Sequence, residues 1–207
     1  MSIREKIASG ASKFAACVEQ HQVDKLYQYA NLLMSWNKRC NLTACKNIED
    51  LIDKHLLDSL SASCLLTPDA NILDLGTGGG LPGIPLSIMY PDKKFTLLDT
   101  NGKKVRFLLH VIYKLQLNNV KAICMNASVY KPLHRFDIVL SRAVASLPKL
   151  WELSSGLLTP DGFLVAMKGV QPVEEMLLLS NQGIKVTTNQ TTEILNIGER
   201  HLIKIAL

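Results

Sequence analysis

The feature that most constrains the fold is a glycine-rich run that directly follows a short apolar segment. Five glycines stand at positions 76, 78, 79, 80 and 83, immediately after the largely apolar segment 72–75. Glycine allows a tight turn and lets a ligand approach the backbone where any Cβ would collide. A turn alone leaves most of these glycines unexplained, so the run indicates a ligand site at the end of a strand.

Beyond residue 71, short apolar segments alternate with segments of helical periodicity. The apolar segments are nearly continuous, as in strands of a parallel sheet that are covered on both faces. This alternation predicts an α/β fold with a doubly wound, Rossmann-like and mostly parallel sheet of seven strands. The expected strands cover residues 72–75, 95–98, 120–125, 138–140, 163–167, 184–188 and 201–206, and the expected helices 84–90, 103–117, 147–157 and 173–181.

The first third of the chain has a helical pattern instead. Asn47 can cap a second helix, with Asp50 as a weak partner at its third position. No turn-rich linker follows, so we expect residues 1–67 to be a helical extension packed on a single globular domain, residues 68–207. The two apolar stripes consist of Val23, Leu26, Tyr27, Ala30, Leu33 and Trp36, and of Ile48, Leu51, Ile52, His55, Leu56 and Leu60.

The net charge of +5 is distributed unevenly along the chain. Residues 1–67 carry eight basic and seven acidic side chains, whereas residues 93–149 carry eleven basic and two acidic ones, a local charge of +9. A solvated surface accounts for many lysine runs. Nine excess charges in 57 residues nevertheless repel one another unless a polyanion uses them, which makes nucleic acid a candidate partner.

Composition excludes several classes of protein. With 47% apolar and 20% charged residues, the chain is neither disordered nor fibrous. No signal peptide or membrane span is visible, because the longest uncharged run is broken by glycines and prolines. The five cysteines include no CxxC pair, so we expect a reduced, cytoplasmic protein without disulfides and without a bound metal.

The residues around the glycine run indicate the kind of ligand. Asp74 stands two residues before Gly76, and Asp99 ends the next strand, where a carboxylate can bind ribose hydroxyls. A dinucleotide fingerprint needs a small residue where this chain has Leu81. Glycines at 76, 78 and 80 are typical of class I S-adenosylmethionine-dependent methyltransferases, whose cofactor has no pyrophosphate to be held.

Further motifs occur in a specific order over nearly the whole chain. They are Trp36-Asn37 with Asn41-Leu42-Thr43, His55 to Leu60, Asp74 to Pro85, Leu97-Leu98-Asp99, Lys103-Lys104, Phe107-Leu108, Phe136-Asp137, Ser141-Arg142-Ala143, Lys168-Gly169 and Gly198 to Leu202. In this order and spacing they resemble the bacterial 16S rRNA guanine-N7 methyltransferase family, also called glucose-inhibited division protein B.

The resemblance implies methyl transfer from S-adenosylmethionine to N7 of a specific guanine in 16S rRNA or the small ribosomal subunit, by a monomer. It also implies that the glycine loop lines the cofactor through Gly76 and Leu81, and that Ala127 and Ser128 meet the adenine through backbone groups. The family commonly has an acidic residue near position 128, which this chain lacks. The full set of expected cofactor-binding residues is Asp74, Gly76, Gly78, Leu81, Asp99, Ala127, Ser128 and Arg142.

The target atom sets the expected mechanism. Guanine N7 carries a lone pair and no proton, so it can attack the sulfonium methyl without a general base. Catalysis then depends on positioning, which can contribute roughly 7–11 kcal/mol. We expect Arg142, after the fourth strand, to act at the mouth of the active site as a guanine or phosphate clamp, with Lys168 in a similar catalytic role.

Other residues have a functional and a structural interpretation. Asn41 could face the RNA from a loop between helices, and Lys103, Lys104 and Arg106 could contact RNA phosphates or be merely solvated. A histidine on an apolar helix face, such as His55, is more often a hydrogen-bonded core residue than a functional one, and Asp58 could be its partner. Trp36 closes an apolar stripe, which favours the core, and Asp74 could bind loop amides or the cofactor.

Two other functions use the same architecture. A dinucleotide-dependent oxidoreductase is disfavoured by Leu81 and by the lack of a catalytic Tyr–Lys pair or His after the fourth strand. A non-catalytic RNA-binding module would not need the glycine loop with Asp74 and Asp99.

Overall fold

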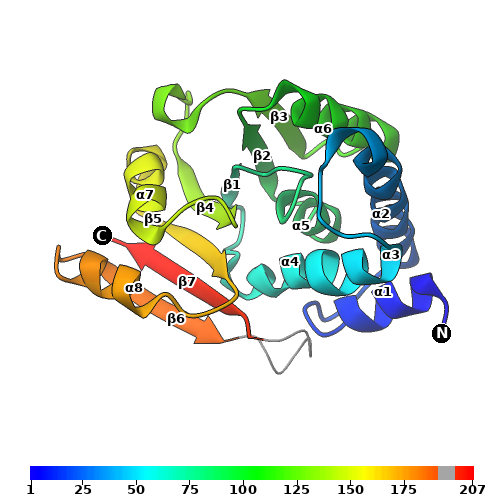
Figure 1. The fold of residues 1–207 in the computed structure, drawn as a ribbon, viewed down its shortest axis with the longest axis horizontal. Helices are drawn as coiled ribbons and strands as arrows, with labels where there is room; N and C mark the ends of the chain where they lie inside the picture. Colours follow the sequence, from blue (N-terminus) through cyan, green and yellow to red (C-terminus); the bar gives the residue numbers. More distant parts are fainter. Residues whose placement is uncertain (191–198) are drawn as a thin grey trace.

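The structure, a computed structural model, describes residues 1–190 and 199–207. Gly198 of the last motif therefore lies outside the described residues. A central twisted sheet carries helices on both faces, and the N-terminal helices lie along one of them (Figure 1). In the described part of the chain no helix has the length and apolar character needed to cross a membrane.

The described residues form a seven-stranded sheet in the order β3-β2-β1-β4-β5-β7-β6. The first five strands run parallel, while β7 is antiparallel to both β5 and β6. The expected fold class is confirmed, and the strand order reverses between β1 and β4, where α/β proteins bind ligands. The strands are β1 Asn71–Leu75, β2 Lys94–Asp99, β3 Val120–Cys124, β4 Phe136–Arg142, β5 Leu158–Lys168, β6 Lys185–Gln190 and β7 His201–Ala206.

Helices in the crossovers cover the two faces of this sheet. One face packs against α5 and α6, and the other against α7 and α8 (Figure 1). Successive residues of β2 show the alternation, since Leu97 faces the first layer and Leu98 the second. The bounds are α5 Gly83–Met89, α6 Gly102–Leu115, η3 Ala127–Val129, α7 Leu147–Ser154, η4 Ser155–Leu157 and α8 Val173–Ser180.

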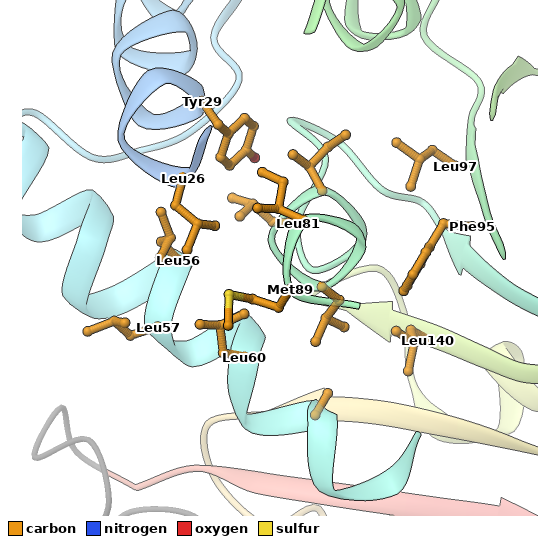
Figure 2. Close-up of a cluster of buried hydrophobic side chains, with 14 of the residues drawn as sticks. Leu26, Tyr29, Leu56, Leu57, Leu60, Leu81, Met89, Phe95, Leu97 and Leu140 are labelled. Atoms are coloured by element: carbon orange, nitrogen blue, oxygen red, sulfur yellow. The ribbon is translucent and has the colours of Figure 1, made fainter. Parts of the chain in front are cut away.

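The N-terminal extension has no core of its own. Leu26 and Tyr29 from its long helix pack with Leu81, Phe95 and Leu140 of the sheet layer in one cluster (Figure 2). The N-terminal elements are α1 Ile3–Ala11, α2 Gln20–Cys40, α3 Ile48–Leu51, η1 Ile52–Leu57, α4 Asp58–Leu60 and η2 Ser61–Leu65. Sequence periodicity missed α1, whose start is fixed by a capping box between Ser2 and Glu5.

The segment expected as one regular helix over 47–60 differs in its middle. Asn47 caps α3 as expected, accepting a hydrogen bond from the Asp50 amide at 2.7 Å. Residues Ile52–Leu57 then form a π-helical stretch, whose wider turns rotate the following residues relative to an α-helix. As a result Asp58 and Ser59 are buried with the leucines, although the α-helical stripe does not include them.

Candidate functional site

The glycine loop joins β1 to α5 and adopts backbone angles that favour glycine. Gly76, Gly78 and Gly80 have φ of +71°, +60° and +93°. A Cβ on Gly76 would lie 2.5 Å from the Val144 side chain, and one on Gly80 would lie 2.6 Å from Ile84. A Cβ on Gly78 would meet only the Gly76 carbonyl oxygen, at 4.0 Å. Packing therefore explains the first and third glycines, whereas the second faces open space that a ligand can occupy.

Asp74, the last-but-one residue of β1, stabilises the glycine loop through hydrogen bonds. Its Oδ2 accepts hydrogen bonds from the Thr77 hydroxyl at 2.6 Å and the Gly83 amide at 2.8 Å. Complete burial raises the pKa of this carboxyl to about 6, against the opposing effect of those two hydrogen bonds. Its Oδ1 has no hydrogen-bond partner. Asp74 therefore acts first on the loop backbone, one of the two roles expected from the sequence.

Asp99, at the end of β2, is joined to the same loop. Its Oδ2 accepts a hydrogen bond from the Gly78 amide at 2.9 Å, and its Oδ1 accepts one from the Asn101 amide at 2.8 Å. The Lys104 ammonium lies 3.8 Å from Oδ2. Each carboxylate oxygen retains a free lone-pair direction, so the group can still accept a bond from a ribose hydroxyl.

A cavity of about 310 Å³, here called the glycine-loop cavity, opens at the carboxyl ends of β1, β2, β3 and β4. This volume lies at the lower end of small-molecule sites. Gly76, Asp99 and Ala127 line it, so the structure brings together expected residues from three separate strand ends. The lining residues are Leu75, Gly76, Leu98, Asp99, Thr100, Lys104, Met125, Asn126, Ala127, Ala143, Val144 and Leu153.

Two other expected cofactor residues, Leu81 and Ser128, are not among the residues that line this cavity. The Leu81 side chain is buried in the core beside Tyr29, so only its backbone is available to a ligand (Figure 2). The exposed Ser128 donates its hydroxyl and amide hydrogens to the Asn126 side-chain oxygen at 3.0 Å. Asn126 itself lines the cavity. Asn126, which the sequence reasoning did not select, is thus a polar residue that lines the cavity next to Ala127.

The N-terminal extension contacts the glycine loop directly. The buried Tyr29 hydroxyl of α2 donates a hydrogen bond to the Gly79 carbonyl at 2.8 Å. A Cβ on Gly79 would lie 2.8 Å from Leu33 of the same helix and 3.4 Å from the Leu42 carbonyl oxygen. Helix α2 therefore packs against the outer side of the loop and restrains its conformation.

A second cavity of about 260 Å³ lies beside the first. It is formed where the ends of β4 and β5 and the start of β7 meet η1 and α4, and Ala143 lines both cavities. Ala143 has φ of +56°, so the chain turns sharply there between the two. The lining residues are Lys54, His55, Asp58, Ser61, Arg142, Ala143, Met167, Lys168, Gly169, Arg200, His201 and Leu202.

Arg142 belongs to this second cavity and is not among the residues that line the glycine-loop cavity. Its Nη1 lies 3.4 Å from Oδ2 of Asp58, and Nε of Arg200 lies 3.3 Å from Oδ1 of the same carboxylate. Burial raises the pKa of Asp58, an effect that the two guanidinium groups oppose. The cluster brings together a strand end, the start of β7 and the N-terminal helices.

His55 lines the second cavity without pairing with Asp58, so that expected pair is wrong. The π-helical stretch between them turns Asp58 toward the two arginines instead. Burial, together with nearby Arg142 and Arg200, lowers the pKa of His55 to about 4, so the ring is neutral at pH 7. Its Nδ1 is buried without a hydrogen-bond partner.

Lys168, at the end of β5, lies in the same cavity as Arg142. Its ammonium donates to the Ala145 carbonyl at 2.9 Å and lies 3.7 Å from Glu175. These contacts anchor the side chain beside the loop that follows β4.

The residues expected to contact RNA divide into two groups. Lys103 and Arg106 are exposed on α6, whereas Lys104 is part of the glycine-loop cavity beside Asp99. Asn41 is exposed and ends α2 with φ of +48°, a left-handed conformation that asparagine tolerates well. That conformation accounts for an asparagine at this position without requiring an RNA contact.

Sequence reasoning gave Arg200 no role in the site. It directly precedes β7, and because β7 is antiparallel to β5, its start lies beside the end of β5, where His201 pairs with Lys168. Only the direction of β7 brings this arginine to the carboxyl edge of the sheet. Val144 was also missed, and the signal that could have found it is its place directly after a strand end.

The glycine-loop cavity fits the adenosylated sulfonium cofactor expected from the sequence. Gly76 presents backbone to the cavity, Asp99 offers a carboxylate acceptor for a ribose, and Leu98, Met125 and Val144 supply apolar surface. Gly78 does not line the cavity, but Asp99 binds its amide and the space beside it is open. Within the described ranges no group of three or more His, Cys, Asp or Glu side chains could hold a metal ion.

Solved structures with similar folds include several methyltransferases. A glycopeptide N-methyltransferase, MtfA, in complex with sinefungin aligns with a TM-score of 0.60 over 72% of this chain and 92% of that one, at 11% identity. A SAM-dependent methyltransferase from Aquifex aeolicus aligns with a TM-score of 0.58 over 76% and 93%, at 17% identity. At these identities the likeness shows the fold alone.

Sequence comparison is more specific. Ribosomal RNA small subunit methyltransferase G of Cellvibrio japonicus is 40% identical, over 97% of this chain and 94% of its own length. The protein of that name from Saccharophagus degradans is 42% identical, over 99% and 93%. The family model GidB, described as rRNA small subunit methyltransferase G, matches residues 22–203. The chain therefore belongs to the GidB, or rRNA small subunit methyltransferase G, family.

Proposed function

We propose that this protein transfers a methyl group from S-adenosylmethionine to N7 of a guanine in 16S rRNA, and that it acts in the cytoplasm on this rRNA or the small ribosomal subunit. The observation that carries the proposal is the pair of cavities that meet at Ala143. One has the features of a nucleoside cofactor site, and the other gathers cationic side chains at the same edge of the sheet. Family membership supports the reaction and the rRNA substrate.

When bound, S-adenosylmethionine supplies an electrophilic methyl group on a sulfonium centre. The residues of this chain hold the cofactor in position. Gly78 leaves its backbone open to a ligand, and Asp99 fixes the loop amide of Gly78 while keeping lone pairs for a ribose. Tyr29 and Asp74 bind the loop backbone from its outer and inner sides, so the glycine loop has its binding conformation before the cofactor enters.

On the substrate side, Arg142 and Lys168 are the proposed catalytic residues. Both line the second cavity, where their cationic groups can bind O6 of guanine or a phosphate oxygen of the target nucleotide. N7 carries no proton, so neither residue has to accept one. Holding N7 in line with the methyl group and sulfur is the main catalytic effect, on the order of 7–11 kcal/mol for well-oriented reactants.

The direct test measures methyl transfer from radiolabelled S-adenosylmethionine to naked 16S rRNA, to assembled 30S subunits and to tRNA, with the modified atom mapped. We expect N7-methylguanosine at one position of 16S rRNA. Methylation only of tRNA, or only at an exocyclic nitrogen, would contradict the proposal. Arg142→Ala and Lys168→Ala should reduce the rate far more than thermal stability, whereas Lys185→Ala, on the exposed edge strand β6, should change neither.

Isothermal calorimetry separates this function from a dinucleotide-dependent one. We expect heat of binding with S-adenosylmethionine and none with NAD(H) or NADP(H). Heat from a dinucleotide alone would refute the methyltransferase proposal. A protein that binds rRNA and S-adenosylmethionine without transferring the methyl group would instead be a binding module.

A further inference from the structure

The second cavity contains a buried carboxylate between two arginines. Asp58 is 4% exposed, and the atoms of Arg142 and Arg200 nearest to it lie 3.4 Å and 3.3 Å from its two oxygens. Charge-assisted hydrogen bonds between nitrogen and oxygen are typically about 2.7–2.9 Å long. The arginines therefore flank the carboxylate without saturating it, and each oxygen can accept further hydrogen bonds.

Among the described residues that line this cavity, Asp58 is the one acidic side chain, and it lies among the cations of Lys54, Arg142, Lys168 and Arg200. Cationic side chains bind phosphate or the acceptors O6 and N7 of guanine, but they cannot accept from the base. If the cavity bound phosphate alone, a carboxylate would oppose binding. Besides pairing with the two arginines, Asp58 can accept from hydrogen-bond donors of the substrate, which no cation in the cavity can do.

The position of the methylated atom limits which edge of the base the protein can read. N7 must face the glycine-loop cavity, and O6 lies next to it. The edge left for recognition presents N1–H and the N2 amino group, two adjacent donors. Two carboxylate oxygens match this pair, whereas adenine presents an unprotonated N1 at the same position, which a carboxylate repels.

We propose that Asp58 is the guanine-specificity residue, accepting hydrogen bonds from N1–H and N2–H₂ of the target base while a neighbouring guanidinium donates to O6. The proposal rests on the proposed function. Transfer to N7 also leaves a positive charge on the base, and a carboxylate at N1–H favours that charge as it develops. The orientation needed comes from the π-helical stretch Ile52–Leu57, which turns Asp58 toward the cavity.

The test compares 16S rRNA carrying guanosine at the mapped target position with the same RNA carrying inosine there. Inosine keeps N7, O6 and N1–H and lacks only the N2 amino group. For the wild-type enzyme we expect kcat/KM to fall about 5- to 150-fold with inosine, since a specific base contact contributes about 1–3 kcal/mol. No fall would overturn the proposal without the need for any variant.

Asp58→Asn supplies the second measurement, with Glu152→Gln as an acid-to-amide control on the exposed side of α7. We expect Asp58→Asn to lower the rate on guanosine and to bring the guanosine-to-inosine ratio close to one, while Glu152→Gln keeps the wild-type rate and ratio. A lower rate with an unchanged ratio would mean that Asp58 only positions the arginines, and would overturn the proposal.

Failure of the proposed function has a different signature. If the wild-type enzyme transfers no methyl group to guanosine RNA, the proposed function fails and this inference fails with it. If transfer occurs and the ratio does not depend on Asp58, only the inference fails. Thermal melting of Asp58→Asn, recorded alongside, distinguishes an altered site from an unfolded chain.

Discussion

Gly78→Ala should distinguish a glycine needed for a turn from one needed for a ligand. Gly78 has φ of +60°, and a Cβ there would meet only a carbonyl oxygen at 4.0 Å. The chain offers two matched controls. Gly183, in the loop between α8 and β6, has φ of +78° and nothing within 4 Å of the position that a Cβ would take, and Gly156 has open space without a positive φ.

The expected stability effects follow from these angles. An alanine in the left-handed region costs about 1–2 kcal/mol, and no steric overlap adds to that at Gly78 or Gly183. For a domain of this size, 1 kcal/mol lowers the melting temperature by about 2–4 °C. Gly78→Ala and Gly183→Ala should therefore melt at similar temperatures, roughly 2–8 °C below the wild type. Gly156→Ala should melt at or slightly above the wild-type temperature.

Cofactor binding should separate the two positive-φ variants. If the cofactor occupies the open space at Gly78, a methyl group there overlaps it, and overpacking of this kind costs about 1–3 kcal/mol. Calorimetric titration with S-adenosylmethionine should give a Kd about 5- to 150-fold higher for Gly78→Ala. Gly183→Ala and Gly156→Ala should bind with the wild-type Kd.

The comparison has a clear refuting result. If Gly78→Ala binds S-adenosylmethionine as tightly as Gly183→Ala, the open space at Gly78 is not part of the cofactor site. If Gly78→Ala is far less stable than Gly183→Ala, the loop is packed more tightly than the structure shows.

Three further outcomes are expected. Tyr29→Phe leaves the buried Gly79 carbonyl without its hydrogen-bond donor, so the free energy of unfolding should fall by about 1–3 kcal/mol. Because the loop is then less well positioned, KM for S-adenosylmethionine should rise by a larger factor than kcat falls. An unchanged KM would contradict a role in loop positioning. Burial raises the pKa of Asp74 from its ordinary value of 3.8 to about 6 in the folded state. The folded state therefore favours the protonated carboxyl, and this contribution to stability is full below pH 3.8 and lost as the pH rises through 6. Relative to Asp74→Asn, the wild-type free energy of unfolding should thus fall by about 3 kcal/mol over that interval in urea titrations, and parallel pH profiles would contradict this. Removing Lys103 and Arg106 together should reduce the salt dependence of RNA binding by about one unit of logarithmic slope for each phosphate that is no longer neutralised, and an unchanged slope would place both outside the RNA interface.

Local sequence patterns were sufficient for the strand–helix order and the glycine loop. Continuous apolar segments and helical stripes depend on which residues are buried within one element, so periodicity reports them. Asn47 and its cap followed from side-chain chemistry within three residues. The helix α1 was missed because its nine residues carry only a short apolar pattern.

The second cavity needed information that spacing does not contain. A period of 3.6 residues places His55 and Asp58 on one helix face, but the π-helical stretch between them sends Asp58 to Arg142 and Arg200. Likewise, motif comparison marks Arg200 without indicating where it lies.

The sequence alone thus determined the class of fold and the strand end that carries the glycine loop, because both depend on residues close together in the chain. Only the tertiary structure decided which side chains share the second cavity. Asp58, Arg142 and Arg200 are separated by up to 142 positions and meet because β7 runs antiparallel to β5 while the N-terminal helices pack over the same edge. Such contacts depend on the direction of strands and on packing between elements, which local periodicity does not encode.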